Sequence, residues 1–435
     1  MTQISTAGVR QKQMATVPIW ALLFCSLFSI LGCTNTPETK AVFKPRVGSW
    51  LMTLDLNGHL LPVDLEFTYN QNDHDVVFKN GEELIHVEDV LLFNDSIVVT
   101  MPLYDSKFIG KFNGPENLSG HWVNFVKGPD YKVAFSAQAG DQPRFLKDSD
   151  GEHGLVSGRW EVDFVFEENT TKAVGVFKQS GDHLTGTFLT ETGDYRFLEG
   201  GVVDDEFSLS CFDGSHAFLF SGTVHNDSIV GGEFYSGTHW VESWTAVRND
   251  EFELTNPDSL TSLKEGYDMI DFSIPDLNGR LVSPRDDKFK DKVLLVQIMG
   301  SWCPNCMDET ALLCELYKER NNDGLEIVAL AFEKHHNTPK AKERVQRMVD
   351  HHGVDYDVLM AGPASKSAAT EQLLFLDNIM SYPTCIIIDR KGVVRKIRTG
   401  FYGPSTGVHY TEYVKKFRLF IDQLLSEEAG VLAGN

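Results

Sequence analysis

Two cysteines separated by two residues mark the point where the chain passes from a buried strand into a helix. The apolar run Lys292–Gly300 is typical of a strand buried on both faces of a mostly parallel sheet. Cys303-Pro304-Asn305-Cys306 follows, and the pattern beyond it predicts a helix over residues 304–320. This order predicts an α/β domain with Cys303 at the helix N-terminus, where free N–H groups and the helix dipole stabilise a thiolate.

The same cysteine pair could also be half of a zinc site. No second Cys-x-x-Cys and no suitably spaced histidine pair completes a set of four ligands. The doublets His335-His336 and His351-His352 consist of adjacent residues, which is not a ligand spacing. We therefore expect neither a metal ion nor another cofactor.

Glu309 lies three residues after Cys306 on the predicted helix. Positions 306, 309, 313 and 316 share one helix face, so Glu309 is expected on the side that carries the second cysteine. A buried carboxyl has a raised pKa and can hold or pass a proton near neutrality. The alternative is a side chain that reaches solvent in the first turn and only favours the helix dipole. The residue pattern leaves both interpretations open.

The rest of the domain alternates strands and helices. The pattern predicts strands at 325–332 and 393–399 and helices at 338–352 and about 410–426. Another strand follows Ser381-Tyr382-Pro383-Thr384. A proline directly before a central strand requires the first position or a special turn, and a cis peptide bond is one such solution.

Residues from about 269 to 428 resemble the TlpA/ResA branch of the thioredoxin superfamily, the extracytoplasmic thiol:disulfide oxidoreductases. The resemblance rests on F-S-I-P-D-L-N-G at 272–279, on the strand with W-C-P-N-C, on the following glutamate, and on Y-P-T-C-I-I-I-D with K-G. It implies a thioredoxin fold and specific roles for residues of the site. The implied roles are the attacking thiolate for Cys303, the resolving thiol for Cys306, proton transfer for Glu309, the cis-proline for Pro383, and substrate contacts for Trp302 and the backbone of Tyr382.

Three features depart from the family pattern. Pro304-Asn305 separates the cysteines where thioredoxin has Gly-Pro, which leaves the reduction potential open over the range of about 150 mV within the superfamily. Gln297 stands where thioredoxin carries a buried aspartate, so Glu309 is expected to be the only nearby proton acceptor. Cys314 and Cys385 are extra thiols, which we interpret as core residues rather than further redox centres.

Between residues 45 and 248 the sequence alternates apolar and polar positions between N-G, N-D and G-D turns, as antiparallel strands do. Landmarks recur at an offset of about 110 residues, so that Gly48-x-Trp50 corresponds to Gly158-x-Trp160. The pattern predicts a duplicated β domain, with each copy a small barrel or sandwich. The expected boundaries are 45–145 and 155–248 for the two copies, 249–268 for a linker, and 269–430 for the thioredoxin-like domain.

The aromatic residues of the two copies could line a ligand site, but tryptophans more often fill barrel cores. No paired carboxylates, glycine-rich phosphate loop or metal-ligand spacing indicates a function for the copies. We interpret Cys211 as a small buried residue. The tryptophans concerned are Trp50, Trp122, Trp160, Trp240 and Trp244.

The chain begins with a segment typical of an exported protein. Residues 17–31 carry no charge and are too few to span a bilayer, but they suit the apolar part of a signal peptide. Leu31-Gly32-Cys33 resembles the lipobox of bacterial lipoproteins, which implies a signal peptide at 1–32 and a lipid on Cys33. An ordinary secretory signal with a chance cysteine is the alternative. The net charge of −23 argues against nucleic acid as the main ligand.

These observations predict a multidomain protein in which tandem antiparallel β repeats, as barrels or sandwiches, precede an α/β thioredoxin fold. The expected function is that of a lipid-anchored, extracytoplasmic thiol:disulfide oxidoreductase of the bacterial cell envelope, facing the periplasm or on the outer membrane. Its expected partners are protein thiols and disulfides and a membrane electron donor. One alternative is a peroxidase of the peroxiredoxin type, although Gly300, Ser301 and Trp302 precede Cys303 where those enzymes have proline and threonine. Another is an envelope binding protein whose β copies do the main work.

Overall fold

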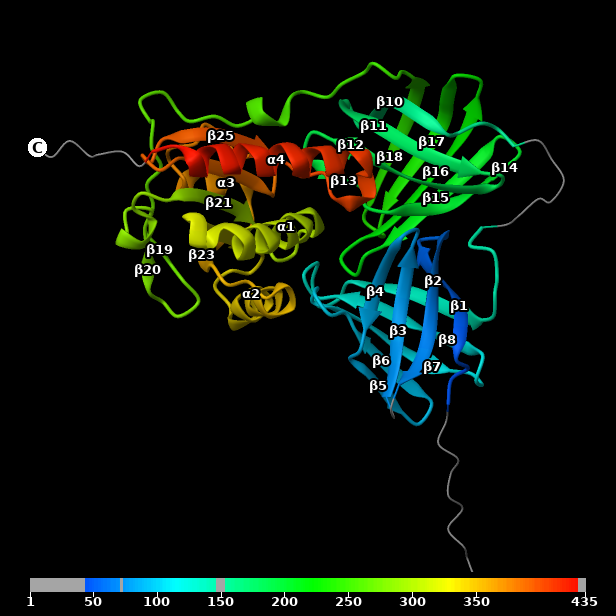
Figure 1. Cartoon of the computed structure of the whole chain (residues 1–435). Helices are drawn as coiled ribbons and strands as arrows, with labels where there is room; N and C mark the ends of the chain where they lie inside the picture. The colour runs from blue at the N-terminus through cyan, green and yellow to red at the C-terminus, as the bar shows by residue number, and fades with distance from the viewer. Residues whose placement is uncertain (1–43, 71–72, 146–152, 429–435) are drawn as a thin grey trace, which may run out of the picture. The chain divides into compact units, whose positions relative to one another are not determined.

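The computed structural model describes residues 44–70, 73–145 and 153–428. Figure 1 shows two parts built from strands and a third part in which helices cover a sheet. The expected fold class, tandem antiparallel β units followed by an α/β thioredoxin fold, is confirmed. Cys33 and the signal segment lie outside the described residues, so the lipid anchor stays a prediction. No helix within the described ranges combines the length and the apolar character that a membrane crossing requires.

The first β unit is a nine-stranded antiparallel sheet in the order β4-β3-β2-β1-β9-β8-β7-β6-β5. Its first and last strands pair, with Trp50 opposite Ala139. Alternate side chains of the last strand, such as those of Val133 and Phe135, enter the core because successive strand residues point to opposite faces. The strands are β1 Gly48–Leu56, β2 His59–Asn70, β3 Asp73–Asn80, β4 Glu83–Val87, β5 Val90–Phe93, β6 Ser96–Thr100, β7 Ser106–Phe112, β8 Asn117–Asn124 and β9 Lys132–Ala139.

The second β unit closes into a barrel. Its sheet order is β11-β10-β18-β17-β16-β15-β14-β12-β13, and an additional β11–β12 pairing closes the sheet, with the two-residue strand β13 attached to β12. Closure leaves no long unpaired edge around the barrel. The strands are β10 Gly158–Phe166, β11 Asn169–Ser180, β12 His183–Thr190, β13 Gly193–Asp194, β14 Leu198–Val203, β15 Glu206–Phe212, β16 Ala217–His225, β17 Ser228–Ser236 and β18 Trp240–Arg248.

The two units share a detail at corresponding positions. The indole N–H of Trp50 donates a hydrogen bond of 2.8 Å to the carbonyl of Arg46, and Trp160 donates one of the same length to Val156. Four of the five tryptophans are core residues, as expected for a barrel interior. Trp240 is the exception, because it is 37% exposed and stacks on Phe166 at the start of β18.

The third part has a five-stranded mixed sheet in the order β23-β22-β21-β24-β25, in which β21, β22 and β23 are parallel and β24 runs antiparallel to both of its neighbours, β21 and β25. Leucines of α1 and apolar residues of α4 pack on β21 in one core. The elements are β19 Ile274–Pro275, β20 Leu281–Val282, β21 Val293–Met299, α1 Pro304–Arg320, β22 Leu325–Glu333, α2 Pro339–His352, β23 Asp357–Pro363, α3 Lys366–Gln372, β24 Thr384–Ile388, β25 Val394–Thr399 and α4 Val408–Ser426, with 3₁₀ turns at Pro257–Ser259, Asp287–Phe289, Asn321–Asp323 and Pro404–Thr406.

Helix α1 has the predicted bounds, and the other predicted helices and strands agree to within about two residues. The sequence analysis missed β23 and α3. β23 is seven residues long and ends in Gly-Pro, and α3 is also only seven residues long. Segments of that length contain too few periods to be distinguished from loops.

Candidate active site

The two cysteines of the Cys-x-x-Cys motif lie at the junction between β21 and α1. Cys303 is the N-cap residue of α1, and its Sγ accepts a hydrogen bond of 3.4 Å from the backbone N–H of Cys306. Pro304 occupies the first helical position, where its missing N–H costs no hydrogen bond. Both cysteines are free thiols here; Cys306 is fully buried and Cys303 is 7% exposed. The sulfur of Cys303 therefore lies at the start of α1, where the N–H of Cys306 points at it.

The segment before β24 lies against this sulfur. The Sγ of Cys303 donates a hydrogen bond of 3.4 Å to the backbone carbonyl of Tyr382. The peptide bond between Tyr382 and Pro383 is cis. The ring of Trp302 meets that of Tyr382 edge-on at a centroid distance of 5.5 Å. The structure therefore brings Trp302, Tyr382 and Pro383 to the cysteine pair, as the resemblance implies.

Glu309 is buried beneath the first turns of α1, with 2% of its surface exposed. The alternative in which this side chain reaches solvent is thus wrong. Its Oε2 accepts a hydrogen bond of 2.9 Å from Nε2 of Gln297, a residue of β21. Burial raises the pKa of Glu309 to about 7, although the Gln297 hydrogen bond opposes the shift. Near neutrality the carboxyl can therefore take up or release a proton.

The second cysteine needs such a proton acceptor. Burial raises the pKa of the Cys306 thiol well above its usual value, and the hydrogen bond and charge of Cys303 add to the effect. Cys306 stays protonated at neutral pH unless a nearby base removes its proton. Glu309, one turn further along α1, is a carboxyl with a suitable pKa.

Glu333 is a second buried carboxyl that the sequence analysis missed. Its two carboxylate oxygens accept hydrogen bonds of 2.7 Å from the N–H of Ser301 and 2.8 Å from its hydroxyl. Burial raises the pKa of Glu333 to about 7. The expectation that Glu309 is the only nearby proton acceptor is therefore wrong. The parallel register that pairs Met299 with Ala331 brings Ser301 level with Glu333, and this long-range pairing leaves no local signal.

The second β unit contacts the segments that hold the cysteines. Around β13, the carbonyl of Thr192 accepts a hydrogen bond of 2.8 Å from the hydroxyl of Ser381, next to Tyr382. The side-chain amide of Asn305, between the cysteines, donates one of 3.4 Å to the carbonyl of Asp194. The strand pattern of the β unit gave no indication of these contacts with the α/β domain.

A buried arginine connects all three parts of the chain. Arg196, just after β13, forms ion pairs with Asp308 of α1 and with Glu83 of β4, the latter at 2.6 Å. Its side chain is only 9% exposed. Because an unpaired buried charge is costly, these carboxylates and the guanidinium depend on one another.

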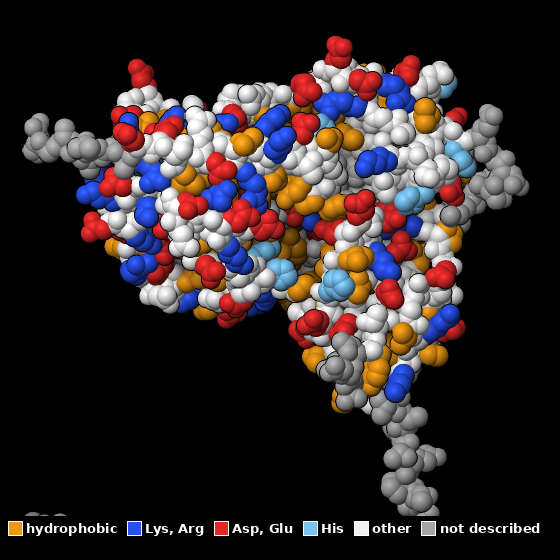
Figure 2. All heavy atoms as spheres, in the orientation of Figure 1, with side chains coloured by type: hydrophobic (Ala, Val, Ile, Leu, Met, Phe, Trp, Pro, Cys, Tyr) orange, Lys and Arg blue, Asp and Glu red, His pale blue; other side chains and the backbone are white. Residues whose placement is uncertain are grey.

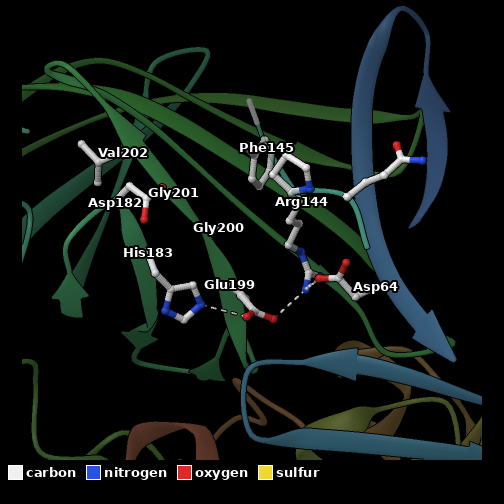
Figure 3. A pocket seen from close by; sticks show the side chains of 11 residues that line it. Asp64, Arg144, Phe145, Asp182, His183, Glu199, Gly200, Gly201 and Val202 are labelled. Atoms are coloured by element: carbon white, nitrogen blue, oxygen red, sulfur yellow. Dashed lines mark hydrogen bonds and ion pairs between the residues drawn. The ribbon is translucent and has the colours of Figure 1, made fainter. Parts of the chain in front are cut away.

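A second ionic cluster joins the two β units (Figure 3). Arg144 donates hydrogen bonds of 3.2 Å to Asp64 of β2 and 2.7 Å to Glu199 of β14. His183 lies 2.9 Å from the other oxygen of Glu199. Since each charge here has a partner, the cluster serves to hold the two sheets together.

The remaining described cysteines are core residues: Cys211, Cys314 and Cys385 are all buried. Cys385 lies opposite Gln297 in the β21–β24 ladder, and burial raises its pKa well above the usual value. A thiol with a raised pKa is a poor nucleophile. In the described ranges no three His, Cys, Asp or Glu side chains are grouped so that they could hold a metal ion.

Comparison with known proteins places the similarity in the α/β domain. The Redoxin family matches residues 264–410. The thiol-disulfide oxidoreductase ResA of Bacillus subtilis is 27% identical over 154 residues, which are 35% of this chain and 78% of that protein. The thioredoxin-like protein YneN of the same organism is 33% identical over 138 residues, covering 32% and 73% of the two chains. A crystal structure of a thioredoxin-family thiol:disulfide interchange protein from Chlorobium tepidum aligns with 22% identity over 37% of this chain and 96% of the other, at a TM-score of 0.28.

Proposed function

This chain belongs, through its C-terminal α/β domain, to the thioredoxin-like thiol-disulfide oxidoreductases of the TlpA/ResA type, and from that premise we propose that Cys303 and Cys306 reduce or exchange disulfides of protein substrates. The observation that carries the proposal is the hydrogen bond from the Cys306 N–H to the Cys303 sulfur at the start of α1. On this basis we assign the attacking role to Cys303, whose sulfur lies at the helix N-terminus.

In the proposed reaction the thiolate of Cys303 attacks one sulfur of the substrate disulfide. A mixed disulfide forms and the other substrate sulfur leaves as a thiolate. Cys306 then transfers its proton to Glu309 and attacks the Cys303 sulfur. This step forms the Cys303–Cys306 disulfide and releases the second substrate thiolate. Two electrons have passed from the cysteine pair to the substrate, so a reductant must restore the pair before the next turnover.

The location of the protein and its reductant are part of the proposal. The signal-like segment and the L-G-C sequence at Cys33 support an extracytoplasmic protein held at a membrane by a lipid. In an oxidising compartment the electrons would come from a membrane donor, since no glutathione pool keeps thiols reduced there. Labelling with a radioactive fatty acid in wild type and in Cys33→Ser tests the anchor, and equal labelling of the two would contradict it.

Insulin reduction with dithiothreitol as electron source tests the activity. We expect turnover in the wild-type protein and its loss in Cys303→Ser. Cys385→Ala, which removes a buried thiol of the same domain, is the matched control and should keep the activity. In Cys306→Ser the mixed disulfide between Cys303 and the substrate should accumulate. Equal insulin reduction by wild type and Cys303→Ser would overturn the proposal.

A further inference from the structure

Lys334, next to the cysteine pair, and three further lysines form no salt bridge among the described residues. Lys334 follows β22, and its Nζ lies 4.9 Å from the ring centroid of Trp302, the residue before Cys303. In the described part of the chain no salt bridge includes Lys107, Lys127, Lys334 or Lys340. The chain as a whole has 62 acidic against 39 basic residues, and red acidic side chains are spread over the face in Figure 2. These four lysines thus add positive charge to a chain that is acidic as a whole.

Each of these lysines lies over an aromatic ring, and one ring joins lysines from two parts of the chain. The loop after β8 supplies Phe125. The Nζ of Lys107 lies 5.3 Å from the centroid of its ring, and the Nζ of Lys340, from α2, lies 5.4 Å from the same centroid. Lys127, in the same loop, lies 5.0 Å from the ring of Tyr131. We call Lys107, Lys127, Lys334 and Lys340 the basic cluster. It is built by the first β unit and by the α/β domain together, so neither part presents it alone.

Lys127 has a buried amino group. Its Nζ is buried and has no hydrogen-bond partner among the described residues. Burial and the charge of Lys334 together lower the pKa of Lys127 to about 8, while Asp213 opposes the shift. A buried amine without an acceptor carries a desolvation cost that an anion in contact with it would offset.

The acidic groups nearby are already engaged. Asp213 accepts a hydrogen bond of 2.6 Å from the backbone N–H of His216 and pairs with its ring. Asp105 accepts two hydrogen bonds, of 2.9 and 3.1 Å, from Arg344. Glu333 is held by Ser301, as described above. The positive charge of the basic cluster is thus left for a group from outside the chain.

Resting on the proposed function, we propose that the basic cluster binds acidic side chains next to the disulfide of the protein substrate. Lys334 places a cation over Trp302, the residue directly before the attacking cysteine. When the substrate disulfide approaches the sulfur of Cys303, carboxylates within a few residues of that disulfide would therefore contact the basic cluster. The cluster would then select acidic segments and bring them to Cys303 faster than neutral ones, because complementary charge raises the association rate.

Two synthetic peptides test this selectivity. Both contain the same intramolecular disulfide, flanked by glutamates in one and by glutamines in the other. The pre-reduced protein is mixed with each peptide, and the rate constant for oxidation of its cysteine pair is followed by tryptophan fluorescence. We expect the glutamate peptide to react about tenfold faster at low salt. The advantage should shrink as the salt concentration rises, since screening weakens charge attraction.

The variants are chosen so that loss of selectivity is separable from loss of folding. Lys127→Met with Lys334→Met should bring the ratio of the glutamate rate to the glutamine rate close to one. Lys415→Met removes an exposed lysine of α4 and should preserve the ratio. The single substitutions Lys107→Met and Lys340→Met repeat the test if the double variant unfolds.

The results distinguish this inference from the proposed function. Equal rates for the two peptides in the wild type, with both reactions abolished in Cys303→Ser, would overturn the basic cluster as a selectivity site and leave the oxidoreductase intact. No reaction with either peptide would overturn the proposed function itself. If the glutamate peptide still reacts faster than the glutamine peptide in both the double variant and the single variants, the role of the cluster is likewise refuted.

Discussion

Gln297 fixes the carboxyl of Glu309 through a hydrogen bond of 2.9 Å from its Nε2 to Oε2. The Oε1 of Gln297 accepts a hydrogen bond of 3.2 Å from the hydroxyl of Thr310, so both ends of the amide are used. The Gln297 side chain is fully buried in β21. The amide thereby holds Glu309 in one orientation beneath α1, where Cys306 also points inward.

Replacing Glu309 by glutamine should slow the second step of the reaction. The variant keeps the size of the side chain but cannot accept the proton of Cys306, so the mixed disulfide should be resolved at least about tenfold more slowly. The rate of resolution should also lose its inflection near pH 7, which corresponds to the raised pKa of Glu309. Rapid acid quenching and mass spectrometry measure the mixed disulfide. Glu315→Gln, on the exposed side of α1, is the control; an unchanged pH profile in Glu309→Gln would contradict the prediction.

Ionisation of Glu309 and Glu333 should destabilise the folded protein as the pH rises from about 4.5 to 7. Glu309 and Glu333 both have an ordinary pKa of 4.5 that burial raises to about 7 in the folded chain. In that window these two carboxyls keep protons in the folded chain that they release in the unfolded chain, so their ionisation favours unfolding. Each glutamate accounts for a loss of about 3 kcal/mol across the window.

Urea unfolding at pH values from 4.5 to 8 measures this loss. The difference in unfolding free energy between wild type and Glu309→Gln should shift in favour of the variant as the pH rises, because the variant has no carboxyl to ionise. A difference that stays constant over the whole range would mean that Glu309 titrates with an ordinary pKa.

Arg196→Met should destabilise the folded protein strongly. The variant leaves Asp308 and Glu83 without their buried cation, and breaking a buried ion pair from one side costs about 3–5 kcal/mol. Arg46→Met is the control, since Arg46 pairs with Glu116 on the surface and such pairs contribute about 1 kcal/mol or less. Chemical denaturation compares the two. Similar small effects for both substitutions would show that the Arg196 ion pairs are weak.

Gly193→Ala should loosen the contact between the second β unit and the cysteine pair. Gly193 has a φ of +147°, and a Cβ there would collide with the side-chain amide of Asn305. We expect reduced Cys303 to be alkylated by iodoacetamide several-fold faster in the variant, as judged by peptide mass spectrometry. Gly181→Ala is a matched control, because Gly181 also has a positive φ but no atom within 4 Å of the added Cβ. Equal alkylation rates in the two variants would refute a covering role for this contact.

Local patterns were sufficient to predict the elements that carry the cysteines. The continuous apolar run of β21, the N-terminal Pro304 and the helical period of α1 are all encoded within about 30 residues, and their bounds were predicted closely. The duplication was also visible, because equivalent residues such as Trp50 and Trp160 occupy equivalent places in their strands.

Contacts between distant segments could not be predicted in this way. In the sequence, Glu333 is only the polar residue at the end of an apolar strand. The β21–β22 register is what brings it to Ser301. Arg196 is 112 residues from Asp308 in the sequence, and no periodicity links them. Lys127 and Lys334 likewise come together only through tertiary packing.

The sequence by itself determined the class of chemistry, because a Cys-x-x-Cys motif between a buried strand and a helix places one sulfur at the helix N-terminus. It also determined the strand-rich character of the first two units through their alternating pattern. Only the tertiary structure decided that Glu309 is buried, that Glu333 lies beside the motif, and that the β units contact the segments around Cys303. The physical reason is that local patterns record which face of an element is apolar, whereas burial of a charge depends on which distant segment covers it.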